Sequence, residues 1–220
     1  MTRADLARLL DHSVLKPEAA RREILEGVEV VRTWRIGQYC VQPGWVREAA
    51  AALEGSGALV ASVIGFPHGC EPGEVKARAA EIAVRDGARE IDMVIQIGRL
   101  KDGDTGAVAA DLSAVVNAVP GIGVKAIIEA RALSDEEKKI ACLIARDCGV
   151  AFVKTSTGFH PAGGATVEDV RLMRAAVGPG IGVKASGGVR SLADARAMLE
   201  AGANRLGTSA SAAILGELPD

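Results

Sequence analysis

Lysine is the residue type in this sequence that most clearly indicates chemistry, because lysines are few and two of them lie within apolar segments. Only eight of the 26 basic residues are lysines, and Lys154 and Lys184 lie inside the apolar runs FVKTSTG and GVKASGG. Lysine is depleted in strands and is rarely buried without a reason. Burial disfavours an ammonium ion, and a second ammonium ion nearby disfavours it again, so one amine of the pair is expected to be neutral near physiological pH. A neutral lysine amine can attack a carbonyl carbon and form a Schiff base.

Two aspartates are candidate site residues that could act together with these lysines. Asp92 lies between Ile91 and Met93 in EIDMVIQ, and a carboxylate among apolar neighbours is costly unless it is paired. We expect Asp92 to accept a hydrogen bond from a lysine or to relay a proton through water. Asp11, in LLDHS, is expected to accept a hydrogen bond from a substrate hydroxyl. The alternative is structural, a buried ion pair between each lysine and a carboxylate such as Asp92 or Glu129.

Three glycine-containing turns indicate an anionic ligand. Each follows an apolar run, and they are Thr157-Gly158, Gly187-Gly188-Val189 and Gly207-Thr208-Ser209. Glycine lets the backbone approach a ligand closely, and backbone N–H groups at helix starts favour anions. Together the turns predict a phosphate site, with Arg190 as an added cation.

The elements that must position these residues form a repeating pattern of strand and helix. Eight apolar runs recur about every 28 residues, at 9–15, 38–43, 58–67, 90–98, 124–130, 151–157, 182–188 and 205–210. Helical patterns separate them, which favours parallel strands with right-handed crossovers. We therefore predict one (β/α)8 barrel domain over residues 1–220, with its chemistry at the carboxyl ends of the strands. A six-stranded doubly wound sheet is the rival, but the nucleotide fingerprint that usually accompanies it does not occur.

Several helix ends are marked in the sequence. Segments 17–33 and 72–86 each open with a proline, which favours a first helical turn. Other helix starts carry the capping-box pattern, and glycines stand where helices are expected to stop. The capping pairs are Ser134 with Glu137, Thr166 with Asp169 and Ser191 with Asp194, and the glycines are Gly87 and Gly202.

The heptapeptide PGIGVKA occurs twice, at 120–126 and at 179–185. The interval of 59 residues is about two repeat units, which places the copies on the fifth and seventh strands of the barrel. Lys125 matches Lys184 in this repeat but stands at the start of its run, so we expect it to lie lower in the barrel and to be salt-bridged. The lysines in helix and loop patterns are expected to be solvated, namely Lys76, Lys101, Lys138 and Lys139.

Composition and charge exclude several classes of protein. The 220 residues carry a formal net charge of −2 and no block of five basic residues, so no nucleic-acid partner is expected. No apolar run reaches the roughly 18 residues that span a membrane, and the amino terminus lacks the apolar core of a signal peptide. The four cysteines form no C-x-x-C pair, which is typical of buried thiols in a reducing cytoplasm. The three histidines complete no metal-ligand spacing, so no metal or other cofactor is expected.

Five motifs follow one another along the chain: LLDHSVLKPEA (9–19), EIDMVIQIG (90–98), FVKTSTGF (152–159), VKASGGVR (183–190) and GTSA (207–210). Together, and in this order, they resemble the deoxyribose-phosphate aldolases, a family of class I aldolases. The resemblance covers essentially the whole chain. It implies a (β/α)8 barrel that reversibly cleaves 2-deoxy-D-ribose 5-phosphate to D-glyceraldehyde 3-phosphate and acetaldehyde in deoxyribonucleoside catabolism, without a metal.

The resemblance also implies a role for individual residues. Lys154 would be the Schiff-base nucleophile, Lys184 would lower its pKa, and Asp92 would relay protons between carbinolamine, imine and enamine. The substrate site would be lined by Asp11, Cys40 and Thr157. The phosphate would be held by Gly158, Gly187, Gly188, Gly207 and Ser209.

Two departures from the family pattern bear on the phosphate contact and on proton transfer, and a third, Gln96 where many relatives have asparagine, puts little in doubt. Some members carry a lysine directly after the KTSTG turn, where Phe159 stands here, so backbone amides are expected to make more of the phosphate contact. Some members end in a tyrosine that assists proton transfer, whereas this chain ends ILGELPD and its one tyrosine is Tyr39. That role is expected to be unfilled or taken by water.

Two other functions account for part of the sequence. A phosphosugar isomerase would use Asp92 or Glu129 as its base and would keep the phosphate turns without an imine. A protein that only binds a phosphorylated metabolite would leave two lysines inside strands unexplained. Barrels of this kind often form homo-oligomers, and we expect one here, without a sequence feature that identifies the contact face.

Overall fold

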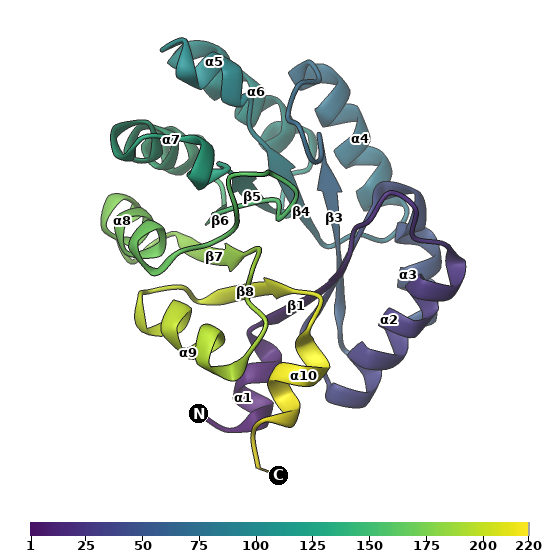
Figure 1. Cartoon of the computed structure of the whole chain (residues 1–220). Coiled ribbons are helices and arrows are strands. Elements are labelled where there is room, and N and C mark those ends of the chain that lie inside the picture. Colours follow the sequence, from purple (N-terminus) through teal and green to yellow (C-terminus); the bar gives the residue numbers. More distant parts are fainter. Residues whose placement is uncertain (220) are drawn as a thin grey trace.

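A closed barrel of eight parallel strands forms the centre of the molecule (Figure 1). The computed structural model describes residues 1–219. The strands pair in chain order, and β8 pairs with β1 to close the barrel. Their bounds are β1 Leu10–Val14, β2 Gln38–Val41, β3 Leu59–Ile64, β4 Glu90–Val94, β5 Gly123–Ile127, β6 Phe152–Lys154, β7 Gly182–Ser186 and β8 Arg205–Thr208. The predicted (β/α)8 architecture is therefore confirmed. Seven of the eight predicted apolar runs contain a whole strand, and β5 begins one residue before its predicted run.

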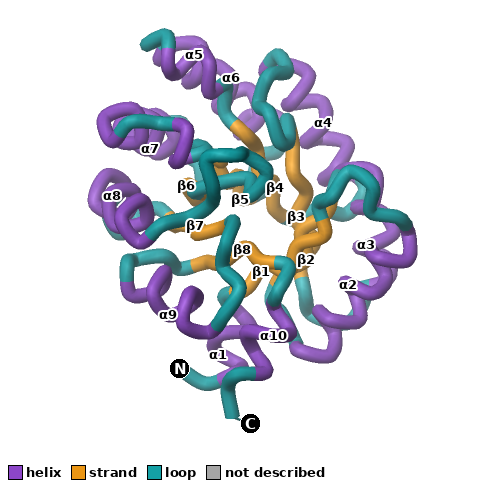
Figure 2. Tube along the Cα trace, in the orientation of Figure 1, coloured by secondary structure: helices purple, strands orange, loops and turns teal. Residues whose placement is uncertain are grey.

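Helices surround the strands as an outer ring (Figure 2). The α-helices are α1 Arg3–Arg8, α2 Arg21–Trp34, α3 Val46–Ala52, α4 Gly73–Arg85, α5 Ile97–Lys101, α6 Thr105–Ala118, α7 Asp135–Asp147, α8 Val167–Val177, α9 Leu192–Glu200 and α10 Ser211–Gly216. Two short 3-10 helices are η1 Pro43–Trp45 and η2 Ala130–Ala132. No helix within residues 1–219 combines the length and the apolar character needed to cross a membrane.

Most predicted helix ends are confirmed. Ser134 and Ser191 form capping boxes at the starts of α7 and α9, and the Thr166 hydroxyl caps α8. Gly87 and Gly202 directly follow the C-cap residues of α4 and α9, which are Asp86 and Ala201, and have positive φ angles. The predicted start of the helix over 17–33 is wrong, because Lys16–Ala19 forms a turn and α2 begins at Arg21.

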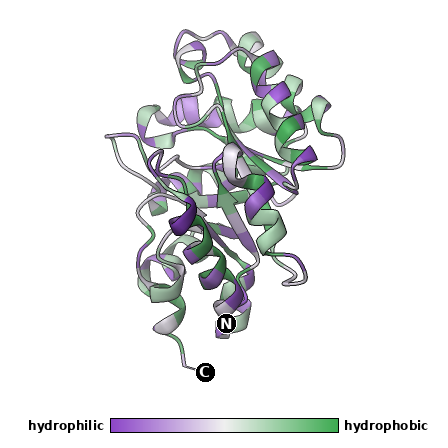
Figure 3. Cartoon of the chain, turned by 90° about the vertical axis from the view of Figure 1, so that its right-hand side faces the viewer, coloured by the Kyte–Doolittle hydropathy of each residue, from purple (hydrophilic) through white to green (hydrophobic). Residues whose placement is uncertain are grey.

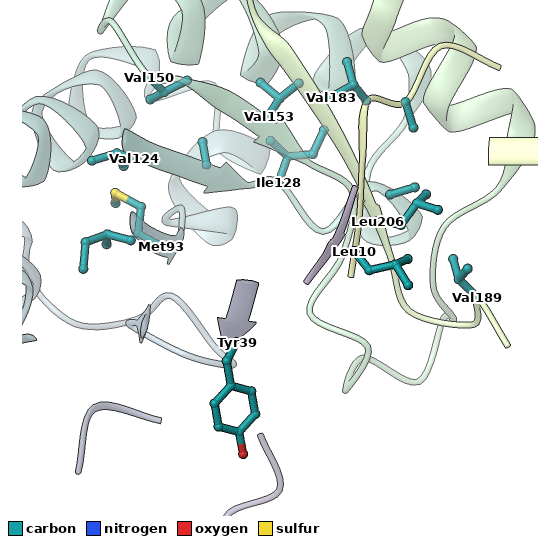
Figure 4. Close-up of a cluster of buried hydrophobic side chains, with 14 of the residues drawn as sticks. Leu10, Tyr39, Met93, Val124, Ile128, Val150, Val153, Val183, Val189 and Leu206 are labelled. Atoms are coloured by element: carbon teal, nitrogen blue, oxygen red, sulfur yellow. The ribbon is translucent and has the colours of Figure 1, made fainter. Parts of the chain in front are cut away.

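Strand alternation separates two very different environments. Residues that face the helices build a large apolar core, part of which appears in Figure 4 as Leu10, Val153 and Leu206 of β1, β6 and β8. The helices that cover this core carry hydrophobic and hydrophilic residues side by side (Figure 3). A separate small apolar cluster consists of Leu15, Cys40, Ala61 and Val63, with Phe66 packed against it. The remaining interior of the barrel is strongly charged, as described below.

Two of the four lysines expected to be solvated are buried. Lys76 on α4 is 1% exposed, and its Nζ lies 2.8 Å from Asp111 Oδ2 of α6 and donates to the Val94 carbonyl. Lys138 on α7 contacts Asp169 at the start of α8 at 2.6 Å. The sequence prediction was wrong because each partner comes from a neighbouring helix, more than 30 residues away in the chain. Lys101 and Lys139 are exposed, as predicted.

We predict that Lys76→Ala destabilises the protein by about 3–5 kcal/mol, because it leaves the buried Asp111 carboxylate without its counter-charge. Lys139→Ala is the matched control, since it also replaces a helical lysine by the best helix former but removes only an exposed ion pair. The control is expected to stay within about 0.5 kcal/mol of the parent. Urea unfolding of the three proteins measures the difference, and equal stabilities would contradict the assigned role of Lys76.

Candidate active site

A cavity of about 780 Å³ opens where the carboxyl ends of the strands meet their loops. It collects nine of the eleven residues that the sequence analysis placed in the site. They are Cys40, Lys154, Thr157, Gly158, Lys184, Gly187, Gly188, Gly207 and Ser209. The other two, Asp11 and Asp92, do not line the cavity and are fully buried in the barrel interior.

Asp92 is the centre of the site. Its Oδ2 accepts hydrogen bonds from Lys154 Nζ at 2.8 Å and from Lys184 Nζ at 2.7 Å. The two lysines are register partners on the neighbouring strands β6 and β7, so their side chains project together into the barrel. The predicted neighbourhood of the two lysines is confirmed, and the ion pair considered as a structural alternative is present in the same arrangement.

The two lysines differ in their second partners. Lys184 also donates to Asp11, whose other oxygen lies 3.1 Å from the Arg205 guanidinium. Asp92 is the single carboxylate paired with Lys154 in the part of the chain that is described. Asp11 thus contacts Lys184 beneath the cavity, and a contact between Asp11 and a substrate hydroxyl stays a prediction.

This asymmetry separates the proton affinities of the two amines. Burial lowers the pKa of Lys154, the nearby Lys184 ammonium lowers it further, and Asp92 opposes them only in part. Burial acts on Lys184 in the same direction, but Asp11 and Asp92 together outweigh it and raise the pKa of Lys184 above its ordinary value. Lys154 is therefore the amine that loses its proton more readily, and a neutral amine facing a cavity is a nucleophile.

A third lysine completes the shell of Asp92. Lys125 Nζ lies 2.7 Å from Asp92 Oδ1 and also contacts Glu90. This confirms the prediction that Lys125 is salt-bridged. The sequence analysis missed Glu90 and Arg205, which open β4 and β8 and whose side chains join the same buried network. Charged residues that begin an apolar run would have been the signal for them.

Glycines allow the predicted phosphate turns to pack closely. Gly158, Gly187 and Gly188 have φ angles of 83°, 81° and 85°, which side-chain-bearing residues rarely adopt. A Cβ on Gly164 would lie 2.2 Å from the Gly187 carbonyl oxygen, so the loop after β6 rests directly on the turn after β7. A Cβ on Gly207 would lie 3.0 Å from Lys184 Cε, so this position also makes room for the lysine.

The backbone N–H groups before α9 are already hydrogen-bonded and are not free to bind an anion. The Asp194 carboxylate accepts from the backbone N–H groups of Arg190 at 2.9 Å and Ser191 at 3.0 Å. These amides are therefore engaged by the helix's own cap, and the glycine turns remain as the backbone donors for a phosphate. Arg190 itself lines the cavity.

Thr157 is held in place by a buried carboxylate. The Thr157 hydroxyl donates to Glu129 Oε2 at 2.6 Å and accepts from the Phe159 N–H at 3.0 Å. Glu129 is 1% exposed and has a left-handed backbone, with φ of 52°. Because its proton is given to Glu129, the Thr157 hydroxyl is available to a ligand as an acceptor.

Apolar and thiol groups also line the cavity. Phe159 lines it, and its ring packs edge-to-face on Phe66 with centroids 5.2 Å apart. Burial raises the pKa of the Cys40 thiol to about 11, so Cys40 is neutral at physiological pH. Tyr39 points the other way, since its hydroxyl donates to the Ile24 carbonyl at 2.9 Å. It does not replace the carboxyl-terminal tyrosine of some relatives.

Comparison with known proteins gives one consistent family. Residues 6–215 match the DeoC/LacD family of aldolases. A deoxyribose-phosphate aldolase of Streptococcus pneumoniae is 50% identical over 216 residues, which are 98% of either chain, and deoxyribose-phosphate aldolase 1 of Bacillus licheniformis is 51% identical over 96% of this chain and 94% of its own. The tetrameric deoxyribose phosphate aldolase of Aeropyrum pernix superimposes with a TM-score of 0.90 at 31% identity, over 98% of this chain and 92% of its own. The lysine pair on Asp92, the glycine turns and these similarities lead to one conclusion, that the chain belongs to the DeoC/LacD family of aldolases.

Proposed function

We propose that this protein is a class I aldolase that reversibly cleaves 2-deoxy-D-ribose 5-phosphate to D-glyceraldehyde 3-phosphate and acetaldehyde, a step of deoxyribonucleoside catabolism. The observation that carries the proposal is the sharing of one Asp92 oxygen by Lys154 and Lys184 at the base of the cavity. That arrangement keeps one amine cationic and makes the other a nucleophile. The names of the curated relatives supply the substrate.

Cleavage begins when the neutral Lys154 amine attacks the C1 carbonyl carbon of the open-chain sugar. The carbinolamine that forms loses water and becomes a protonated imine. The bond between C2 and C3 then breaks, the C3 hydroxyl loses its proton, and the electron pair of the broken bond forms an enamine with the imine carbon. D-glyceraldehyde 3-phosphate leaves, C2 of the enamine is protonated, and water hydrolyses the imine to acetaldehyde and free Lys154.

Proton exchange at the Lys154 nitrogen has a donor and an acceptor beside it. Lys184 is cationic and shares Asp92 Oδ2 with Lys154, so a proton can pass between the amines by way of that carboxylate or a water. The cationic imine serves as the electron sink, and the proposed chemistry therefore requires no metal or other cofactor. Asp92 is ionised before any transfer begins, because the three surrounding lysines hold the pKa of this buried carboxyl well below its usual range against the opposing effect of burial.

The remaining site residues bind the substrate. Backbone amides of Gly158, Gly187 and Gly188, with Gly207 and Ser209, would hold the phosphate at the rim of the cavity. Thr157 would accept a hydrogen bond from a sugar hydroxyl, and Cys40 would line the same cavity. Asp11, which lies beneath the cavity, would act on the substrate through Lys184. Phe159 offers no charge to the phosphate, so backbone donors and Arg190 carry that contact.

We also propose a homo-oligomer located in the cytoplasm, acting on a phosphorylated sugar and without a nucleic-acid or membrane partner. The tetramer named for the Aeropyrum pernix relative supports the oligomer. The four cysteines are free, which suits a reducing compartment. A net charge of −2 gives nucleic acid no electrostatic attraction.

Borohydride reduction in the presence of acetaldehyde tests the proposed function. We expect an ethyl group on Lys154, located by peptide mass mapping, because reduction converts the imine into a stable secondary amine. A Lys154→Leu variant should lose this adduct and all cleavage activity. Retained turnover of a phosphosugar without an adduct would instead support an isomerase, and binding without turnover would support a non-catalytic protein.

Lys184→Leu should move the acidic limb of the pH–rate profile to higher pH. The neutral form of Lys154 is the active one, and it predominates above its pKa. Removing the Lys184 cation leaves two carboxylates without that partner near Lys154, which raises the Lys154 pKa by on the order of one unit. The measurement is kcat/KM as a function of pH, and an unshifted limb would remove Lys184 from this role.

Gly164→Ala should raise KM for the phosphorylated substrate about tenfold or more, because the new methyl group collides with the Gly187 carbonyl and moves the phosphate turn. Gly180→Ala is the matched control, since Gly180 has open space around its Cβ position. The control is expected to keep the parental KM. A parental KM for Gly164→Ala as well would show that the packing of the two loops does not position the phosphate.

A further inference from the structure

A second layer of buried charges lies beneath the two cavity lysines, and the reaction steps above do not use it. Lys125 Nζ lies 2.7 Å from Asp92 Oδ1 and contacts the Glu90 carboxylate. Arg205 lies 3.9 Å from Glu90 and 3.1 Å from Asp11, and its guanidinium stacks on the Phe152 ring at 5.4 Å. We call Glu90, Lys125 and Arg205 the floor of the site.

The floor lies away from the cavity. Glu90 and Arg205 are the first residues of β4 and β8, whereas the cavity opens at the carboxyl ends of the strands. The side chain of Lys125 is 0% exposed, and none of the three residues lines the cavity. The floor therefore cannot touch the substrate, and any influence it has must act through Asp92 and Asp11.

The charges of floor and cavity together nearly cancel. The connected network of ion pairs in the interior consists of four cationic side chains and three carboxylates, namely Lys125, Lys154, Lys184 and Arg205 with Asp11, Glu90 and Asp92. Cys40, which also lies near Lys154, is neutral because burial raises its pKa to about 11. With all four cations charged, the buried cluster has a net charge of +1, and release of one proton brings it to zero. A buried cluster is most stable close to neutrality, because unpaired charge in a low-dielectric interior is costly.

We propose that Lys125 and Glu90 are positioning residues, which hold Asp92 from below and set the charge balance that makes Lys154 the lysine to release its proton. Lys125 occupies Oδ1 of Asp92 and leaves Oδ2 for the two cavity lysines. Glu90 in turn limits the positive charge that Lys125 and Arg205 bring to the interior. The inference rests on the proposed function, in which neutral Lys154 is the nucleophile.

The ion pairs around Lys154 support this assignment over a direct role for Lys125. Lys184 is paired with Asp11 and Asp92, and Lys125 is paired with Asp92, Glu90 and, at 3.8 Å, Asp11. Each of these two lysines thus has at least two carboxylates that favour its protonated form. Lys154 shares one carboxylate oxygen with Lys184 and faces the cavity. Of the three lysines in the cluster, it is therefore the one whose protonated form is least stabilised by carboxylates.

Two floor variants with opposite charge changes test the proposal. Lys125→Met removes a cation, so Lys154 should keep its proton to higher pH, by on the order of one unit. Glu90→Gln removes an anion, so Lys154 should release its proton at lower pH, by a similar amount. The double variant restores the parental net charge, and its pH dependence should return toward that of the parent protein.

The readout is the initial rate of ethylation of Lys154 by acetaldehyde and cyanoborohydride as a function of pH, followed by peptide mass mapping. This rate reports imine formation and does not require turnover of the sugar phosphate. Lys138→Met is the matched control, because Lys138 is also a buried lysine between two carboxylates but lies on α7, outside the barrel. It should lower stability and leave the midpoint of the pH dependence unchanged.

The outcomes separate the two proposals. Opposite shifts for the single variants, cancelling in the double variant, support the assigned role of the floor. Folded variants whose midpoints do not move, or move in the same direction, would overturn it while leaving Lys154 as the nucleophile. If the single variants fail to fold, a double variant that folds with a midpoint far from the parental one would also overturn it. Absence of any adduct on parental Lys154 at every pH would instead overturn the proposed function.

Discussion

The Asp92 carboxylate, buried at the centre of the barrel, is the contact on which the rest of the site depends. Its two oxygens accept from Lys125, Lys154 and Lys184, which come from the three strands β5, β6 and β7. Taking charged groups out of water is costly, and this cost is offset only when each charge has close partners with good geometry. The strand register provides that geometry, because it places Lys125 opposite Asp92 and Lys184 opposite Lys154.

Because the buried charges must stay paired inside the barrel, the residues that stabilise the fold and the charged residues of the site lie on different faces of the same strands. Eight-stranded barrels commonly fill their interior with branched apolar side chains. Here the interior holds an ion network and a small apolar cluster of four residues, and the large core lies between strands and helices. The chain's small aliphatic residues suit that outer layer, where helices must pack closely on strands. A charge in the interior can therefore be altered without opening the main core, whereas Lys76 and Lys138 belong to the helical layer.

The sequence predicted the fold and most of the site, for an identifiable reason. The spacing of the apolar runs, the order of the strands and the location of barrel active sites at the carboxyl ends of the strands are local or topological properties. They were therefore sufficient to predict that Lys154, Lys184 and Asp92 lie close together. Properties that depend on a distant partner could not be predicted in the same way. Lys76 occupies a helical pattern that is typical of a solvated face, and its burial follows from Asp111 on another helix. Proline at position 17 indicated a helix start, but that residue lies in a turn before α2.

The feature that spacing alone predicts least is which of the two lysines has the lowered pKa. Lys154 and Lys184 share strand context, burial and the same Asp92 oxygen, so spacing alone treats them alike. They are distinguished by β1, because its Asp11 pairs with Lys184 and gives that lysine a second carboxylate. Asp11 lies more than 140 residues from either lysine and becomes their neighbour only when β8 pairs with β1. Closure of the barrel pairs the edge strands β1 and β8, and it also brings the Asp11 carboxylate to Lys184. That carboxylate makes the two amines chemically different.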